Sequence, residues 1–363
     1  MDYLADVLAS GHTQGDGPFT DRAQELIDRI LGTTGSLLTT SCTHALELAW
    51  AVLDCGAGDE VIVPSFTFSS GAISVLQSGA TPVFVDCDSR TGNIDPAEVG
   101  PAIGQRTKAI LTMHYAGAAS GIRELRGIAD EHGLALVEDN AHGLGATYDG
   151  TKLGTIGDVS VQSYHATKNV QAGEGGSIYF ADDAHRERAQ IIREKGTDRS
   201  RFLRGEVDKY SWVDLGSSYL PSELCAAVLT AQLEAFDEIQ AMRMGVWNSY
   251  SAGLAEWAEL FGPSVELMPL DPLAEHPAHM FYILMTDSDE RDRLLKHLHQ
   301  QDIVATFHYV PLHSSRAGRK YGRLHGDCHR ATEFSGRLLR LPLWAGMTDG
   351  DVERVIDAVR SFR

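Results

Sequence analysis

Residues 43–182 alternate between two sequence patterns, and this alternation constrains the fold more than any other feature of the chain. Short runs rich in β-branched and other apolar residues lie at 60–66, 81–88, 108–116, 134–141, 158–166 and 176–182. Amphipathic patterns typical of helices separate most of them, at 43–54, 68–79 and 122–133. Strands that are buried on both faces and joined by helices form parallel sheets. The sequence therefore predicts an α/β fold with a mostly parallel central sheet.

The pattern changes after Gly196. A long helix is predicted to follow Pro221 and to continue to about Leu260, because its apolar residues recur three or four positions apart. Beyond it, strand patterns at 280–287 and 305–311 alternate with helical patterns near 289–300, 329–339 and 348–361. A length of 363 residues also favours two domains. We predict a large α/β domain over 1–240 and a small C-terminal α+β domain over 241–363.

The charge balance and the cysteines exclude several classes of protein. The chain has 31 basic and 50 acidic residues, so its net charge of −19 repels a nucleic-acid backbone but allows a small anion in a local basic pocket. Its five cysteines form no CxxC pair, and neither a disulfide framework nor a metal site is expected. The chain lacks a signal-peptide pattern and a membrane-spanning apolar run. We expect a cytoplasmic protein that binds neither nucleic acid nor membrane.

Chemistry in a parallel sheet concentrates in the residues that follow the strands. Ser41, Cys42 and Thr43 precede a predicted helix, whose free N–H groups and positive dipole end suit a phosphate. An ordinary N-cap explains the same residues. Glu138 and Asp139 end an apolar strand. A carboxylate there either caps the next helix, pairs with a cation, or holds a proton on a buried cationic ring.

A lysine and a glycine-rich turn follow the next predicted strand. The segment SYHATKNVQAGEGG contains Ser163, His165 and Lys168 before the turn at 173–176. A lysine beside a turn that lets the backbone approach closely is a candidate for Schiff-base formation. A surface lysine in a β-turn is the alternative.

The order of these parts along one sheet predicts a cofactor. Phe66 and Phe68 add an aromatic near a strand end, either as core or as a stacking platform. Pyridoxal 5'-phosphate (PLP) needs a phosphate cradle, a ring stack, a carboxylate at its pyridine nitrogen and a Schiff-base lysine. No GxGxxG follows the first strand and no GxxxxGK[ST] is present, which argues against nicotinamide and nucleoside-triphosphate cofactors.

Segments across almost the whole chain resemble the DegT/DnrJ/EryC1/StrS family of PLP-dependent nucleotide-sugar aminotransferases. They include GDGPFTDRAQEL (15–26), LLTTSCTHALELA (37–49), GDEVIVPSFTF (58–68), LVEDNAHGLGATYDG (136–150), SYHATKNVQAGEGG (163–176) and FHYVPLH (307–313). The resemblance implies an aspartate-aminotransferase-like fold, the PLP-dependent transferase fold type I. It also implies a homodimer whose active sites are shared between subunits.

The resemblance assigns roles to single residues. Lys168 matches the Schiff-base lysine, Asp139 the carboxylate at the pyridine nitrogen and Phe68 the ring-stacking aromatic. The phosphate-cradle positions match Cys42, Thr43 and Ser163.

Two positions depart from the family pattern. The family commonly has Gln near the cofactor's phenolic oxygen, where this chain has His142. It often has an Asn that reaches the phosphate across the dimer, where this chain has Ser218. Both residues are still expected to contact the cofactor.

A closer resemblance concerns the substrate. Residues 191–220 resemble the dTDP-4-dehydro-6-deoxyglucose 4-aminotransferases, among them the dTDP-4-amino-4,6-dideoxygalactose transaminases. This implies a dTDP-4-amino-4,6-dideoxyhexose product, galacto or gluco, with L-glutamate as amino donor. The sugar's diphosphate needs cations, and a basic segment offers Arg199, Arg204 and Lys209, although a solvated loop explains it equally. His308 and Tyr309 are expected to line the sugar pocket.

Other functions remain open at the level of sequence. The chain could aminate C3 or another nucleotide ketosugar, or catalyse a different PLP reaction such as β-elimination. It could also be a non-catalytic PLP-binding sensor. The presence of both Lys168 and Asp139 argues against the sensor.

Overall fold

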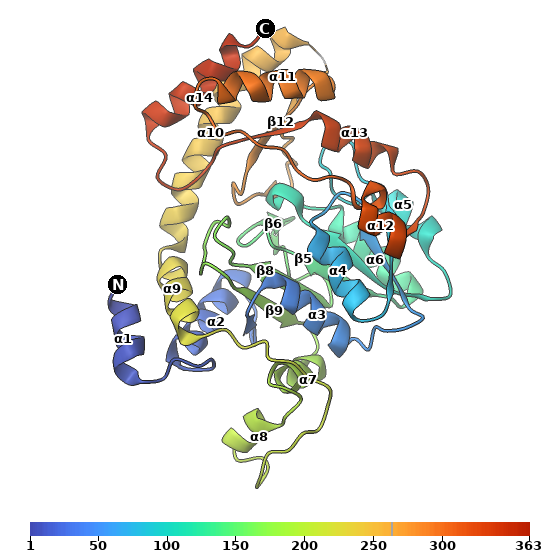
Figure 1. Ribbon diagram of the computed structural model, residues 1–363, viewed down its shortest axis with the longest axis vertical. Helices are drawn as coiled ribbons and strands as arrows, with labels where there is room; N and C mark the ends of the chain where they lie inside the picture. The colour runs from blue at the N-terminus through green and yellow to red at the C-terminus, as the bar shows by residue number, and fades with distance from the viewer. Residues whose placement is uncertain (263) are drawn as a thin grey trace.

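An eight-stranded sheet forms the centre of the larger part of the computed structural model, which describes residues 1–262 and 264–363 (Figure 1). Its strand order is β1-β9-β8-β5-β4-β2-β3-β13. The strands are β1 (Leu37–Thr39), β2 (Glu60–Pro64), β3 (Thr81–Val85), β4 (Thr107–Met113), β5 (Ala135–Asp139), β8 (Val159–Ser163), β9 (Gly176–Phe180) and β13 (Arg323–Leu324). All neighbours pair in parallel except β9, which is antiparallel to β8 and β1. The predicted mostly parallel α/β sheet is confirmed.

Helices cover both faces of this sheet, because successive strand residues point to opposite faces. Val61 and Val63 of β2 pack in one core with Trp50, whereas Ile62 between them packs in another with Leu125. The covering helices are α3 (Cys42–Val52), α4 (Ser69–Gln77), α5 (Pro96–Ala102), α6 (Ile122–His132) and α7 (Asp183–Arg193).

The strands end earlier than the sequence pattern predicts. The predicted runs 134–141 and 158–166 correspond to β5, which ends at Asp139, and β8, which ends at Ser163. Tight turns follow both strands: Asp139 accepts a hydrogen bond from the N–H of Ala141 at 3.1 Å, and the Lys168 N–H donates to the His165 carbonyl at 2.9 Å. These turns aim polar side chains at the carboxyl edge of the sheet.

The prediction of a single helix after Pro221 is wrong, because the structure has two helices that meet at Ala235. The two resulting helices are α9 (Glu223–Glu234) and α10 (Phe236–Phe261). Ala235 has backbone angles of φ −93° and ψ 15°, which lie outside the helical range. Helix α10 runs through residue 240 toward the C-terminal elements (Figure 1). The domain division at that residue stays a prediction.

The C-terminal part contains a small antiparallel sheet packed against helices, which agrees with the predicted mixture of strands and helices. Its strands are β10 (Glu266–Leu267), β12 (Phe281–Leu284) and β14 (Leu338–Leu341), and its helices α11 (Ser288–His299), α13 (His329–Arg337) and α14 (Asp349–Ser361). The predicted strand at 305–311 is wrong: one isolated bridge, between Thr306 and Arg340, is the pairing found there. This part and the large sheet share one core, in which Phe66 and Tyr115 lie with Phe281 and Phe334.

The remaining elements surround the two sheets. They are α1 (Asp2–Ser10), α2 (Pro18–Leu31), α8 (Arg199–Leu203), α12 (Arg316–Tyr321), the 3₁₀ turns η1 (Tyr115–Gly117) and η2 (Leu312–Ser314), and the short strands β6 (Thr147–Tyr148), β7 (Thr151–Lys152) and β11 (Ala274–Glu275). Within the residues described, no helix is both long and apolar enough to cross a membrane.

Gly176 allows the first turn of α3 to approach the sheet. A Cβ atom at this position would lie 2.4 Å from the carbonyl carbon of Ser41 and 2.5 Å from the amide nitrogen of Cys42. Real Cβ atoms do not approach backbone atoms so closely, so glycine is required where β9 begins.

Gly176→Ala is therefore expected to destabilise the protein by about 1–3 kcal/mol, because backbone must move to admit the methyl group. Gly127→Ala is the matched control: Gly127 lies in α6, and its Cβ would meet nothing within 4 Å. That variant is expected to gain about 0.5–1 kcal/mol, because alanine favours helix more than glycine. Thermal unfolding of both variants checks the prediction, and a Gly176→Ala protein as stable as the wild type would contradict it.

Candidate active site

A cavity of about 440 Å³ opens at the carboxyl edge of the large sheet. The large sheet and its loops contribute most of the lining, and residues after α10 close the other side. The lining residues are Ser41, Cys42, Thr43, Phe68, Ser70, Met113, Asp139, Ala141, His142, Ser163, His165, Thr167, Lys168, Glu174, Gly175, His279, His308, Tyr309 and Arg340. Most of the residues that the sequence singled out therefore meet at one place.

The first turn of α3 forms one wall of this cavity. Ser41 caps the helix by accepting the N–H of His44 at 3.1 Å. Other N–H groups in a first turn have no partner within the helix, so those of Cys42 and Thr43 can bind an anion. The Thr43 hydroxyl also lies 2.7 Å from that of Ser70. The capping role and the phosphate role, which the sequence presented as alternatives, are thus compatible.

Lys168 and Asp139 line the same cavity, and burial acts on both. Desolvation lowers the pKa of the Lys168 amine, although the charge of Asp139 opposes the shift. Desolvation raises the pKa of the Asp139 carboxyl, opposed by the N–H of Ala141 and by Lys168. The charged form of each group is therefore less favourable here than in water. A bound partner of opposite charge stabilises that charged form.

Glu138 and Asp139 point to opposite faces of β5, and this resolves the choice between them. The Glu138 carboxylate is fully buried and accepts the N–H groups of Gly154, Ile156 and Gly157, together with Nε2 of His114 at 2.8 Å. Although burial acts to raise its pKa, His114 and these N–H groups leave it lowered. Glu138 holds a loop in place, whereas Asp139 lines the cavity.

The two phenylalanines also separate. Phe66 is buried in the core, where its ring meets that of Phe334 edge-on at 4.8 Å. Phe68 lines the cavity and exposes 54% of its surface. Phe68 is thus the aromatic that a flat ligand can reach.

Two histidines of the cavity, His142 and His279, are buried against each other. The rings of His142 and His279 stack with their centres 4.2 Å apart, and burial lowers the pKa of both well below the usual range. The Ala116 N–H donates to Nδ1 of His142 at 3.3 Å. The ring proton of His142 therefore lies on Nε2, and this N–H is the one donor that the ring offers to a ligand.

The remaining predicted residues do not line this cavity. Ser218 forms a backbone bridge with Glu194, Arg199 pairs with Glu194, and Arg204 pairs with Glu206. Lys209 lies in the same segment, which projects from the body around α8 (Figure 1). Within one chain these side chains do not reach the site, and their predicted roles would have to be exercised from a second subunit.

His279 and Arg340 line the cavity but were not singled out from the sequence. Both come from the C-terminal part, which only the complete fold brings to the sheet edge. One signal for Arg340 does exist, because it is the polar residue in the apolar run LLRL (338–341).

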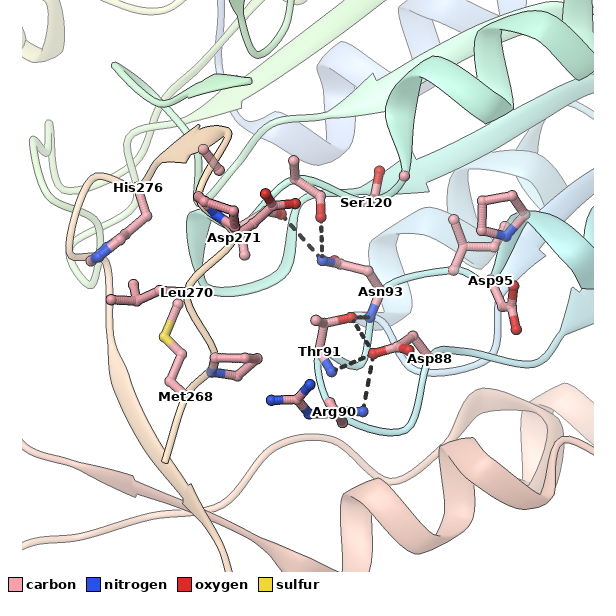
Figure 2. Close-up of a pocket in the computed structure, with 18 residues that line it drawn as sticks. Asp88, Arg90, Thr91, Asn93, Asp95, Ser120, Met268, Leu270, Asp271 and His276 are labelled. Carbon is pink, nitrogen blue, oxygen red and sulfur yellow. Dashed lines mark hydrogen bonds between the residues drawn. The ribbon is translucent and has the colours of Figure 1, made fainter. Parts of the chain in front are cut away.

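A second cavity, of about 470 Å³, lies between the loop after β3 and residues 268–276 (Figure 2). Its polar groups hold the protein's own loops. The Asn93 amide donates to the carbonyls of Ala118 and Ala119 and accepts the N–H of Tyr115 at 2.7 Å. Asp88 accepts the N–H groups of Arg90 and Thr91. Asn93 and Asp88 therefore hold the loops around this cavity in place, including the one that carries Tyr115.

The residues of the first cavity fit PLP. A helix N-terminus, a cavity-lining carboxylate, an accessible aromatic ring and a lysine amine converge there. One oxygen of Asp139 accepts the Ala141 N–H, which leaves the other for a protonated ring nitrogen. Together with the mostly parallel sheet, this arrangement defines a PLP-dependent enzyme of fold type I.

The chain belongs to the DegT/DnrJ/EryC1/StrS aminotransferase family, whose model matches residues 1–360. It is 31% identical over 368 residues to the spore coat polysaccharide biosynthesis protein SpsC of Bacillus subtilis, covering 99% of this chain and 93% of that protein. Among solved structures, DesV of S. venezuelae is 32% identical, with a TM-score of 0.90 and coverage of 99% and 92%. Spr1654 of Streptococcus pneumoniae, solved in PLP and PMP forms, is 25% identical, with a TM-score of 0.90 and coverage of 99% and 95%. The protein is thus a PLP-dependent sugar aminotransferase.

Borohydride reduction of the PLP-loaded protein is expected to attach the cofactor to Lys168, because its pKa is lowered and it lines the cavity. Peptide mapping by mass spectrometry identifies the labelled residue. Lys168→Ala is expected to lose both the label and turnover. A label on another lysine would contradict the assignment.

Asp139→Asn is expected to lower turnover roughly 100-fold or more with little effect on stability, because it removes a charge that stabilises a developing carbanion. Glu138→Gln is the matched comparison on the opposite face of the strand. It is expected to lower the thermal unfolding temperature by about 4 °C or more, because buried N–H groups lose a charged acceptor. Steady-state rates and thermal unfolding separate the two effects, and near-normal activity in Asp139→Asn would refute the role of Asp139.

Proposed function

We propose that the enzyme converts dTDP-4-dehydro-6-deoxy-D-glucose to a dTDP-4-amino-4,6-dideoxyhexose, with L-glutamate as amino donor. The meeting of Lys168, Asp139 and the α3 N-terminus in one cavity carries the aminotransferase part of this proposal. The resemblance of residues 191–220 to the 4-aminotransferases supports the substrate. The description of SpsC as a polysaccharide biosynthesis protein agrees with a sugar substrate.

PLP, when bound, supplies a ring that withdraws electrons from the carbon bearing the amino group. Cys42, Thr43 and Ser163 bind its phosphate, and Phe68 packs against its ring. Asp139 holds a proton at the ring nitrogen, and Nε2 of His142 donates to the phenolic oxygen. The Lys168 amine would take the proton from the donor's α-carbon and deliver it to the C4′ carbon of the cofactor, on the other side of the amino nitrogen. In the second half of the cycle it moves a proton in the reverse direction, onto the sugar carbon.

Lys168 acts from one side of the cofactor, so the orientation of the hexose decides which epimer forms. His308 and Tyr309 line the cavity, and we propose that they set this orientation together with the 199–210 segment of a second subunit. The overall resemblance favours the galacto product.

We also propose a homodimer that shares its active sites, located in the cytoplasm. The projecting segment exposes large apolar side chains, with Leu203 at 67%, Trp212 at 77% and Leu215 at 76% exposure. Such a run is unfavourable in water and suits a protein interface. A second subunit would bring Arg199, Arg204, Lys209 and Ser218 toward a cavity that they do not reach in their own chain.

The product identifies the reaction. Incubation of the enzyme with dTDP-4-dehydro-6-deoxyglucose and L-glutamate is expected to give a product aminated at C4, measured by mass spectrometry and NMR. Small H4 couplings identify the galacto epimer and two large couplings the gluco epimer. A product aminated at C3, or a turnover confined to another nucleotide ketosugar, would overturn the substrate assignment.

Sedimentation under assay conditions tests the shared site. The double variant Trp212→Ser, Leu215→Ser is expected to shift the protein toward monomer and to lose activity in parallel. Leu260→Ser is the control, since Leu260 is 79% exposed at the far end of α10. A wild-type monomer with full activity would contradict the proposed sharing.

A further inference from the structure

Arg340 is held rigidly at the edge of the active-site cavity. It lies in β14, where it pairs with Tyr282 of β12. On the other side its backbone exchanges two hydrogen bonds with Thr306, at 2.7 and 3.1 Å. Pairing on both sides fixes the direction in which the side chain leaves the strand, and this side chain lines the cavity.

The guanidinium of Arg340 has no carboxylate partner among residues 1–262 and 264–363. Its Nη1 donates to Nε2 of His308, and its Nε is buried without a hydrogen-bond partner. Arg193, by contrast, pairs with Asp16, and Arg330 pairs with three carboxylates. Arg243, which also has no ion-pair partner among the described residues, donates instead to the carbonyls of Ala278 and His279. A partly buried guanidinium with unused donors is a binding site for an anion.

His308 orients this guanidinium. Arginine has only donors, and Nη1 of Arg340 lies much nearer to Nε2 of His308 than to its Nδ1, so Nε2 is the acceptor and the ring proton lies on Nδ1. Nδ1 then donates to the hydroxyl of Tyr115 at 3.3 Å, and the His308 ring stacks on that of Tyr309 at 4.2 Å. Burial and the neighbouring Arg340 charge lower the pKa of His308 to about 3, so it stays neutral.

Two carboxylates and two cationic side chains line the cavity, and its other titratable side chains include four imidazoles. Two carboxylates line it: Asp139, and Glu174, whose side chain is 69% exposed and lies near His165. The cationic side chains are Arg340 and Lys168, whereas burial lowers the pKa of His142, His279 and His308. Lys168 and Asp139 are assigned to the cofactor, so the charge of Arg340 is left for a substrate anion that binds close to the reacting carbon.

We propose that Arg340 binds the α-carboxylate of the amino donor, with His308 as the residue that positions its guanidinium. This inference rests on the proposed function and names the residue that recognises the first substrate. In an amino acid the carboxylate is attached to the carbon that carries the amine, so it must bind within the cavity of Lys168. The diphosphate of a nucleotide sugar is attached to C1, across the ring from the C4 that reacts, and therefore belongs farther out.

The test separates the two halves of the reaction in Arg340→Gln. In the first, PLP-loaded protein is mixed with L-glutamate, and the loss of visible absorbance gives an apparent dissociation constant. Arg340→Gln is expected to raise this constant about 10–100-fold, the effect of losing charge-assisted hydrogen bonds. The affinity for 2-methyl-L-glutamate, which has no α-hydrogen and cannot turn over, is expected to fall by the same factor. In the second half, the pyridoxamine form is expected to bind the ketosugar within about threefold of the wild type.

A probe without the α-carboxylate charge makes the test specific. The α-amide of L-glutamate is expected to bind the wild type as weakly as glutamate binds Arg340→Gln. The same amide is expected to lose no more than about threefold further in the variant, because the interaction is already absent. If the loss of affinity caused by the amide and the loss caused by Arg340→Gln simply add, the proposal is overturned. It is also overturned if Arg340→Gln impairs only the half-reaction with the sugar.

Two further variants test whether the effect depends on the shape of the guanidinium and on its position in the chain. Arg340→Lys keeps the charge without the planar fork and is expected to bind glutamate with intermediate affinity. Arg29→Gln, at an exposed position of α2, is expected to match the wild type. Visible absorbance of bound PLP shows that each variant is folded. If the ketosugar is not aminated by any variant but glutamate binding still depends on Arg340, the substrate proposal fails and the inference about Arg340 stands.

Discussion

Parallel pairing of β4, β5 and β8 directs three connections out of the sheet at the same edge, and the rest of the site depends on this constraint. β5 ends at Asp139, β8 ends at Ser163, and the turn after β8 carries Lys168 to the same cavity. α3 reaches that edge because Gly176 lets the backbone of Ser41 and Cys42 approach β9. A register shift of one residue in β5 would exchange the faces of Asp139 and Glu138.

The electrostatics of the cavity follow from its burial. Burial lowers the pKa of Lys168, raises that of Asp139 and lowers those of His142, His279 and His308. The protein alone therefore offers few compensating charges to these groups. We propose that ligands supply them: a protonated ring nitrogen beside Asp139 and a carboxylate beside Arg340. In this account the large sheet holds the cofactor and the C-terminal part selects the amino donor.

The sequence predicted the parallel sheet and most of the cavity because both depend on local patterns. Strand-end positions such as Lys168 and Asp139 follow from the alternation of strands and helices along the chain. The residue pattern alone did not separate Glu138 from Asp139, because their roles depend on which face of β5 each occupies in the finished sheet, and the family resemblance was needed to assign the role to Asp139. Arg340 and His279 were missed because they reach the cavity through packing between distant segments. The helix break at Ala235 was not predicted, because neither Pro nor Gly lies near that residue.

The role of Asp139 at the cofactor's ring nitrogen is the claim on which the proposed chemistry depends most. Nitrogen-15 NMR of the protein loaded with ring-labelled PLP measures the protonation of that nitrogen directly. We predict the chemical shift of a protonated pyridine in the wild type and a shift toward the neutral ring in Asp139→Asn. A neutral ring nitrogen in the wild type, or a protonated one that is unchanged in Asp139→Asn, would contradict this account.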